Sequence, residues 1–97
     1  MRALFFIGSS QKDIQSFPEA VKDDVGYALF RIQQGATPGC AKPLKGFGGG
    51  VLEIIEDSRE GTYRAAYTVK FDEAIYVLHC FQKKSKHGIE REDPQRQ

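Results

Sequence analysis

Two consecutive runs of residues decide the fold: Tyr63-Arg-Ala-Ala-Tyr-Thr-Val-Lys-Phe71 and Ala74-Ile-Tyr-Val-Leu-His-Cys-Phe81. In the first run large apolar residues alternate with polar or small ones, a period of two that is typical of a half-buried strand. The second run is apolar on both faces, as expected for a strand in the interior of a sheet. Only an Asp-Glu pair separates the runs, so we predict a hairpin whose polar face carries Arg64 and Lys70.

The residues before this hairpin predict a strand followed by two helices. Ala3–Ile7 is a short apolar run that suits a buried strand. Ser10, with an acidic residue three positions later, suits the start of a short helix that ends near Phe17. A second helix is predicted over Pro18–Gln34, because Pro favours a first helical position and Gly35 favours an end. Its apolar side chains follow a helical period and form one stripe: Val21, Val25, Ala28, Leu29 and Ile32.

A connection rich in Gly and Pro, residues 35–50, leads to a further strand over residues 51–56. A connection of this length is unusual in so small a domain unless it has a function. Its run Gly48-Gly49-Gly50 is not a P-loop, because no Lys-Ser or Lys-Thr pair follows it. The order of elements predicts an α+β fold: an N-terminal strand and a helical hairpin packed on one face of a mainly antiparallel sheet of about four strands.

The composition is that of one small soluble domain. With 97 residues, 40% of them hydrophobic, the chain can build a single modest core. No apolar run approaches the roughly 20 residues that span a bilayer, and the apolar N-terminus is too short for a signal peptide. We therefore expect a cytoplasmic protein with no membrane contact. Its single domain is predicted over residues 1–89, followed by a polar, disordered tail over residues 90–97.

Charge and cysteine content exclude several classes of site. The net charge of +1 provides no overall basic field, but lysines are concentrated locally, in the central connection and after the last strand: Lys42, Lys45, Lys83, Lys84 and Lys86. Cys40 and Cys80 lack the spacing of a CxxC motif, and His79 and His87 are not spaced with them as zinc ligands. We therefore predict two reduced thiols, with Cys80 in the core, and no metal or cofactor.

The remaining polar residues fit the cleavage of RNA without a metal. In that reaction a 2′-hydroxyl attacks the neighbouring phosphate, and fixed cations such as Arg64 and nearby lysines stabilise the added negative charge. A histidine, a tyrosine or a lysine would transfer protons. The same residues also have structural interpretations: the lysines as a solvated surface, His79 as a hydrogen-bonded core residue, and Tyr67 and Tyr76 as packing residues.

Three stretches resemble a known family: Ala41-Lys-Pro-Leu-Lys-Gly-Phe-Gly-Gly-Gly-Val-Leu-Glu-Ile54, Thr62-Tyr-Arg-Ala-Ala-Tyr67 and Val77-Leu-His-Cys-Phe-Gln-Lys-Lys-Ser-Lys86. Together they resemble the phage-derived, HigB-like branch of the RelE/ParE toxin superfamily, over nearly the whole chain from Leu4 to Ile89. The resemblance implies a helical hairpin on a curved antiparallel sheet. It also implies the toxin of a type II toxin–antitoxin module, neutralised by an antitoxin that usually carries a helix-turn-helix domain.

The resemblance further implies a ribosome-dependent mRNA endonuclease that inhibits translation, and it suggests which residues act. Arg64 matches the arginine of the central strand, and Lys83 and Lys84 match the basic end of the last strand. His79, Tyr67 and a lysine remain alternatives for the acid/base group, with His79 placed among the candidate catalytic residues. The expected RNA-binding residues are Lys45, Lys70 and Lys86.

The sequence departs from the family pattern at the C-terminus and leaves two rival functions open. Family members usually have a helix after the Lys-Lys-Ser-Lys run, whereas residues 87–97 contain Pro94 and show no apolar periodicity. Without that helix, an uncovered sheet face would favour a homodimer or another partner. The rivals are a toxin that inhibits a protein target such as gyrase, and a degenerate toxin that only binds an antitoxin or itself.

Overall fold

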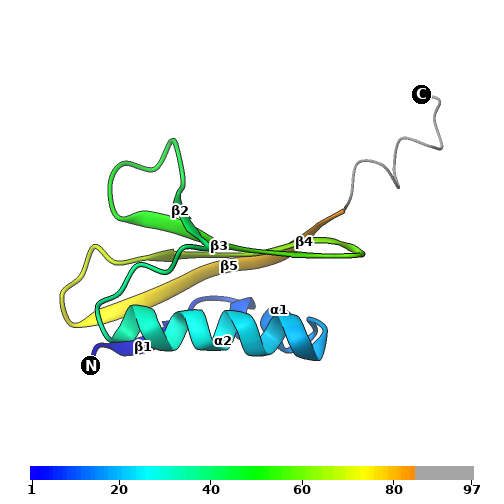
Figure 1. The fold of residues 1–97 in the computed structure, drawn as a ribbon. Coiled ribbons are helices and arrows are strands. Elements are labelled where there is room, and N and C mark those ends of the chain that lie inside the picture. Colours follow the sequence, from blue (N-terminus) through cyan, green and yellow to red (C-terminus); the bar gives the residue numbers. More distant parts are fainter. Residues whose placement is uncertain (85–97) are drawn as a thin grey trace.

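The predicted hairpin forms the centre of a five-stranded sheet in the computed structural model, which describes residues 1–84. The elements, in chain order, are β1 (Ala3–Phe6), α1 (Ser10–Gln15), α2 (Glu19–Gln33), β2 (Ala41–Pro43), β3 (Val51–Ser58), β4 (Gly61–Thr68) and β5 (Ala74–Lys84). The strand order is β1-β5-β4-β3-β2, with β1 parallel to β5 and the other pairs antiparallel. Both helices cover one face of the sheet (Figure 1). The predicted α+β fold with the helices on one face is confirmed.

The prediction of about four strands missed β2. This strand lies inside the connection predicted over residues 35–50, and it pairs with the first half of β3, Lys42 opposite Glu53. Three residues are too few to show a period of two, so only the pairing with β3 defines the strand. The connection that follows, residues 44–50, rises from the sheet on the side away from the helices (Figure 1).

The first helix begins as predicted, but its N-cap residue is different and makes no side-chain hydrogen bond to the helix backbone. Ser9, not Ser10, occupies the N-cap, and its hydroxyl donates to a carboxylate oxygen of Asp13 at 2.8 Å. The Ser10 hydroxyl is buried and donates to the Val77 carbonyl of β5 at 3.1 Å, which ties the helix to the sheet. The helix ends at Gln15, two residues before the predicted end, and Phe17 packs its ring on Tyr63, with centroids 4.8 Å apart.

The core lies between the helices and the sheet. The predicted stripe of α2 is buried along its length, at Val21, Val25, Ala28, Leu29 and Ile32. Facing it, β4 buries Tyr63, Ala65 and Tyr67, every second residue as the alternation predicts, but the strand ends at Thr68, and Phe71 at the end of the predicted run is 51% exposed. Cys80 is buried in the same core, as predicted. The helix ends at Gln33, where Gly35 takes a left-handed φ of +100° and terminates it.

A β-bulge in β5 changes which residues face the helices. Ala66 pairs with His79, but the next residue, Tyr67, pairs with Val77, so Leu78 is an extra residue on β5. Because Val77 faces the core, strict alternation would also turn His79 to the core. The bulge shifts the alternation by one residue, so Cys80 is buried instead and His79 is exposed.

Several predictions fall on residues that the structure does not describe. These are Lys86, the end of the domain at residue 89, the disordered tail over residues 90–97 and the question of a C-terminal helix. Within residues 1–84, no helix is long and apolar enough to cross a membrane.

Candidate functional site

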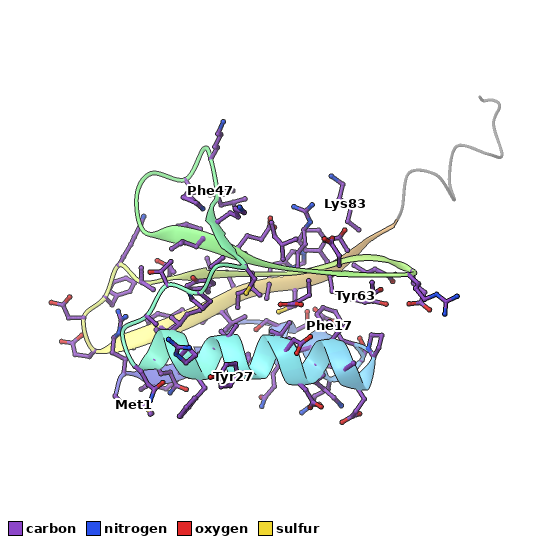
Figure 2. The ribbon with its side chains drawn as sticks, in the orientation of Figure 1. Met1, Phe17, Tyr27, Phe47, Tyr63 and Lys83 are labelled. Carbon is purple, nitrogen blue, oxygen red and sulfur yellow. The ribbon has the colours of Figure 1, made fainter. Side chains whose placement is uncertain are left out.

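The face of the sheet opposite α1 and α2, called here the open face, carries the candidate functional residues. Figure 2 shows Phe47 and Lys83 on this side of the sheet, whereas Tyr27 lies on the helix side. Residues that pair directly across neighbouring strands share a face of the sheet. Each set of directly paired residues on the open face is called a row here. Three successive rows bring together acidic, basic and aromatic side chains.

The first row crosses four strands and consists of Lys42, Glu53, Ala66 and His79, each paired directly with the next. Glu53 and His79 therefore flank Ala66, and two strand spacings put their Cα atoms about 10 Å apart. The Ala66 side chain is a single methyl group, so it leaves a hollow between the carboxylate and the imidazole. A carboxylate and an imidazole on either side of a hollow can serve as a base and an acid for one bound group.

The second row places Arg64 between Ile55 and Phe81, diagonal to Glu53. Arg64 Nη1 donates to Glu53 Oε1 at 2.9 Å, and the two side chains are only 24% and 8% exposed. The ion pair orients the guanidinium and satisfies a carboxylate that is nearly removed from water. Arg64 Nε is also buried and has no hydrogen-bond partner among the described residues. A guanidinium has five N–H donors, so donors remain for a further anion.

His79 is exposed on the open face, and its ring stacks on Phe81 with centroids 5.1 Å apart and an interplanar angle of 24°. The interpretation of His79 as a core residue is therefore wrong, because the bulge at Leu78 turns it away from the helices. Stacking on Phe81 restricts the orientation of the imidazole. The ring is thus held beside Ala66 and open to solvent.

The candidate lysines are distributed around these rows. Lys83 pairs with Thr62 in the third row and is exposed, pointing away from the helices in Figure 2. Lys45 is exposed in the connection between β2 and β3. Lys70 was predicted on the polar face of the hairpin strand, but β4 ends at Thr68 and Lys70 lies beyond it, exposed. Its side chain packs so close to Gly50 that a Cβ there would come within 2.7 Å of it. The backbone of Lys84 pairs with Gly61 at the end of β5.

Tyr67 lies on the other face and is 1% exposed in the core. Burial, and to a smaller extent the charge of Cys40, raise the pKa of Tyr67 to about 12. A buried phenol with a raised pKa on the helix side is a packing residue, as one of the two interpretations predicted. Of the acid/base alternatives, the open face therefore presents His79 and lysines but not Tyr67.

Sequence reasoning missed two residues of the first row, Glu53 and Lys42. Glu53 interrupts the apolar run Val51–Ile55, and an acidic residue inside a buried strand is a signal that a partner or a function holds it there. The sequence predicts Lys42 only as one of several locally concentrated lysines, because it does not predict the strand β2. Among residues 1–84, no three His, Cys, Asp or Glu side chains gather in a way that would hold a metal ion.

Sequence comparison connects this chain with a phage-derived family. Residues 12–95 match the family described as "Phage derived protein Gp49-like (DUF891)". No curated protein sequence matches the chain.

Structural comparison finds the same fold in solved toxins. The isolated RelE toxin of Escherichia coli has a TM-score of 0.69 at 18% identity, covering 98% of this chain and 99% of that one. A mutant of the same toxin in the free state has a TM-score of 0.63 at 19% identity, covering 98% of this chain and 96% of that one. The toxin–antitoxin complex RelBE2 of Mycobacterium tuberculosis has a TM-score of 0.58 at 19% identity, covering 84% of this chain and 98% of that one. The chain has the RelE fold.

Proposed function

Because this chain belongs to the Gp49-like family of phage-derived proteins and has the RelE fold, we propose that it is the toxin of a type II toxin–antitoxin module, of the HigB-like branch. It acts in the cytoplasm as a ribosome-dependent mRNA endonuclease, and an antitoxin with a helix-turn-helix domain neutralises it. The solved complex of a relative in fold, RelBE2, is a toxin bound to its antitoxin and supports this kind of partner.

The observation that carries the proposal is the placement of Glu53 and His79 on either side of Ala66, with Arg64 in the next row. A phosphate bound over Ala66 would lie between a carboxylate and an imidazole. The attacking and leaving oxygens of the phosphorane lie on opposite sides of the phosphorus, and each needs a hydrogen bond to a catalytic group. Cα atoms about 10 Å apart, with both side chains lining the hollow, are compatible with this span.

The reaction is an internal displacement at phosphorus. The Glu53 carboxylate accepts the proton of the 2′-hydroxyl, whose oxygen forms a new bond to the adjacent phosphorus. The bond from phosphorus to the 5′-oxygen breaks, and the imidazolium of His79 gives its proton to that oxygen. The products are a 2′,3′-cyclic phosphate and a free 5′-hydroxyl. Arg64 stabilises the negative charge of the phosphorane through the N–H groups that Glu53 does not occupy.

The lysines around the rows would hold the RNA backbone. Lys83 continues the open face beyond Arg64, and Lys45 and Lys70 lie at the connection between β2 and β3 and after β4. Lys84 and Lys86 extend the basic run in the sequence. Phosphate contacts of this kind position a nucleic acid without selecting its sequence.

The test is induced expression in cells that lack the antitoxin, with growth and mRNA 5′-ends as readouts. We expect growth arrest and new 5′-ends inside translated messages. His79→Ala, and Glu53→Gln in protein that circular dichroism shows to be folded, should each reduce cleavage by about 10²- to 10⁴-fold, the usual contribution of a general base or acid. Tyr27→Ala, a change of an exposed residue on the helix side, is the control and should cut as the wild type does.

Two outcomes would overturn the proposal. Arrest without new 5′-ends would point to a toxin that inhibits a protein target such as gyrase. Absence of arrest from a folded, soluble protein would point to a degenerate toxin that only binds its antitoxin or itself.

A further inference from the structure

A hollow on the open face is lined by the two proton-transfer groups proposed above and by five further residues to which that reaction gives no role. Its volume is about 340 Å³, and it is lined by Leu44, Phe47, Val51, Glu53, Ala66, Leu78, His79 and Phe81. The connection between β2 and β3 forms one wall and β5 forms the opposite wall. Ala66 of β4 lies between Glu53 and His79 in the first row, and all three line the hollow, so the hollow includes the proposed phosphate position.

The walls of the hollow are apolar and aromatic. Phe47 belongs to the raised connection and is 59% exposed, although a large aromatic side chain would normally be buried. On the other wall, His79 and Phe81 stack on each other and present a flat surface. Such a space favours a flat, largely apolar group that enters between Phe47 and β5.

The charges around the hollow favour an anionic chain that carries this group. Lys45 lies two residues before Phe47 on the same raised connection, and Lys42 precedes it on β2. Arg64 pairs directly with Phe81, and Lys83 lies two residues beyond Phe81 on β5. Only a nucleic acid combines flat apolar groups with a regularly spaced negative backbone, and unpaired bases stack on aromatic side chains without regard to sequence.

We propose that the hollow between Phe47 and the His79–Phe81 pair binds one unpaired nucleobase next to the scissile phosphate. This inference rests on the proposed RNA cleavage, and it names the substrate contact of the same site. The base leaves its stack in the message and enters the hollow, while its own phosphate lies over Ala66.

The hollow also fits a base by size. Its volume lies near the lower end of the range of about 300–1,000 Å³ found for small-molecule sites, so a nucleobase fits within it. The connection that carries Phe47 contains Gly46 and Gly48 with φ values of +90° and +75°. These left-handed conformations, which favour glycine, fold the connection back so that Phe47 faces the sheet.

The experiment measures base binding directly with the full-length protein. The probe is an oligonucleotide of one 2-aminopurine deoxynucleotide flanked on each side by abasic deoxyribose phosphates, so that it has one base and no 2′-hydroxyl to cleave. Stacking is followed by quenching of the 2-aminopurine fluorescence. The competitor has the same backbone with an abasic position in place of 2-aminopurine.

Phe47→Ala should weaken probe binding by about 5- to 150-fold, the range expected for the loss of one base stack. Binding of the abasic competitor should not change. Tyr27→Ala is a matched control, because Tyr27 is 61% exposed, close to the exposure of Phe47, but lies on the helix side. The inference is wrong if Phe47→Ala binds the probe as the wild type does. It is also wrong if the abasic competitor displaces the probe as well as the probe displaces itself.

This inference and the proposed function fail separately. If the wild type binds the probe through Phe47 but cuts no mRNA, the base site stands and the nuclease function falls. If the wild type cuts mRNA and Phe47→Ala changes neither probe binding nor the distribution of cuts, the nuclease function stands and the base site falls.

Discussion

Arg64 and Glu53 depend on each other for their positions in the sheet. The carboxylate is nearly buried, and the structure pairs it with the guanidinium at 2.9 Å. Removing one member of such a pair leaves an uncompensated charge in a place with little water, whereas removing both does not. A simple Arg64→Ala variant therefore changes both the folding stability and the charge of the site, and loss of activity alone would not identify a catalytic role.

We predict that Arg64→Ala lowers the free energy of unfolding by about 3 kcal/mol, and that adding Glu53→Ala to it restores part of the loss. Urea denaturation of the two single variants and the double variant measures the coupling. Arg59→Ala, at an exposed position in the turn between β3 and β4, is the control and should change stability by less than about 0.5 kcal/mol. Additive losses in the double variant would show that the pair does not act as a unit.

The activity of Arg64 is better tested by Arg64→Lys, which keeps a positive charge beside Glu53 but loses the planar set of donors. We expect a stable protein with cleavage reduced by about 10²- to 10³-fold, as for the loss of one transition-state donor. Full cleavage by this variant would mean that only the charge matters and would remove the guanidinium from the proposed mechanism.

At the scale of elements, the packing of α2 against β3 contains an acidic residue at its edge. Glu56 of β3 has a raised pKa, caused first by burial and then by the negative charge of Asp24 on α2, while a hydrogen bond with Cys40 acts in the opposite direction. A carboxyl group whose pKa is raised on folding holds its proton more tightly in the folded state. Its contribution to stability therefore falls as the pH rises from the ordinary carboxyl range through the folded pKa.

We predict that Glu56→Gln raises the melting temperature at pH 7.5 and that the gain is smaller at pH 4, where the carboxyl group is largely protonated. Because Glu56 is partly exposed and solvent screens it, the gain at pH 7.5 should be only about 1–3 °C. Thermal unfolding followed by circular dichroism at the two pH values measures it. Glu73→Gln, which removes an exposed carboxylate before β5, is the matched control for the change in net charge. An equal gain at both pH values would contradict the assignment.

For the whole molecule, the distribution of charge matters more than its sum. The net charge is +1, yet the open face and its edges carry Lys42, Lys45, Arg64 and Lys83 against Glu53, whereas α1 and α2 carry four acidic and three basic residues. Binding to RNA should therefore depend on a local field on one face. Each phosphate contact contributes to the salt dependence of binding, so this dependence reports the contacts.

We predict that Lys45→Glu with Lys83→Glu weakens binding to single-stranded RNA and reduces the slope of log affinity against log salt by about 1.4, or about 0.7 for each lost phosphate contact. Filter binding at several salt concentrations measures the slope. Lys12→Glu with Arg31→Glu changes the net charge by the same amount on α1 and α2 and should leave the slope nearly unchanged. An equal effect of the two pairs would mean that net charge, not the open face, drives binding.

Local periodicity in the sequence was sufficient to predict the parts of the fold that depend on near neighbours. The stripe of α2 and the alternation of β4 follow from residues three or four and two positions apart, so the buried set from Val21 to Ile32 and the trio Tyr63, Ala65 and Tyr67 was predicted from the chain alone. Arg64 on the polar face of β4 was predicted in the same way. These patterns do not require knowledge of how distant segments meet.

The sequence by itself thus determined the helices, the central hairpin and the face that carries Arg64, while the tertiary structure decided which other residues share that face. The pairing of β2 with β3 brings in Lys42, and the register of β3 on β4 places Glu53 beside Arg64. The bulge at Leu78 brings His79 out of the core. The physical reason is that a shift of one residue in a strand turns every following side chain to the other face, and such a shift is set by long-range pairing rather than by the local sequence.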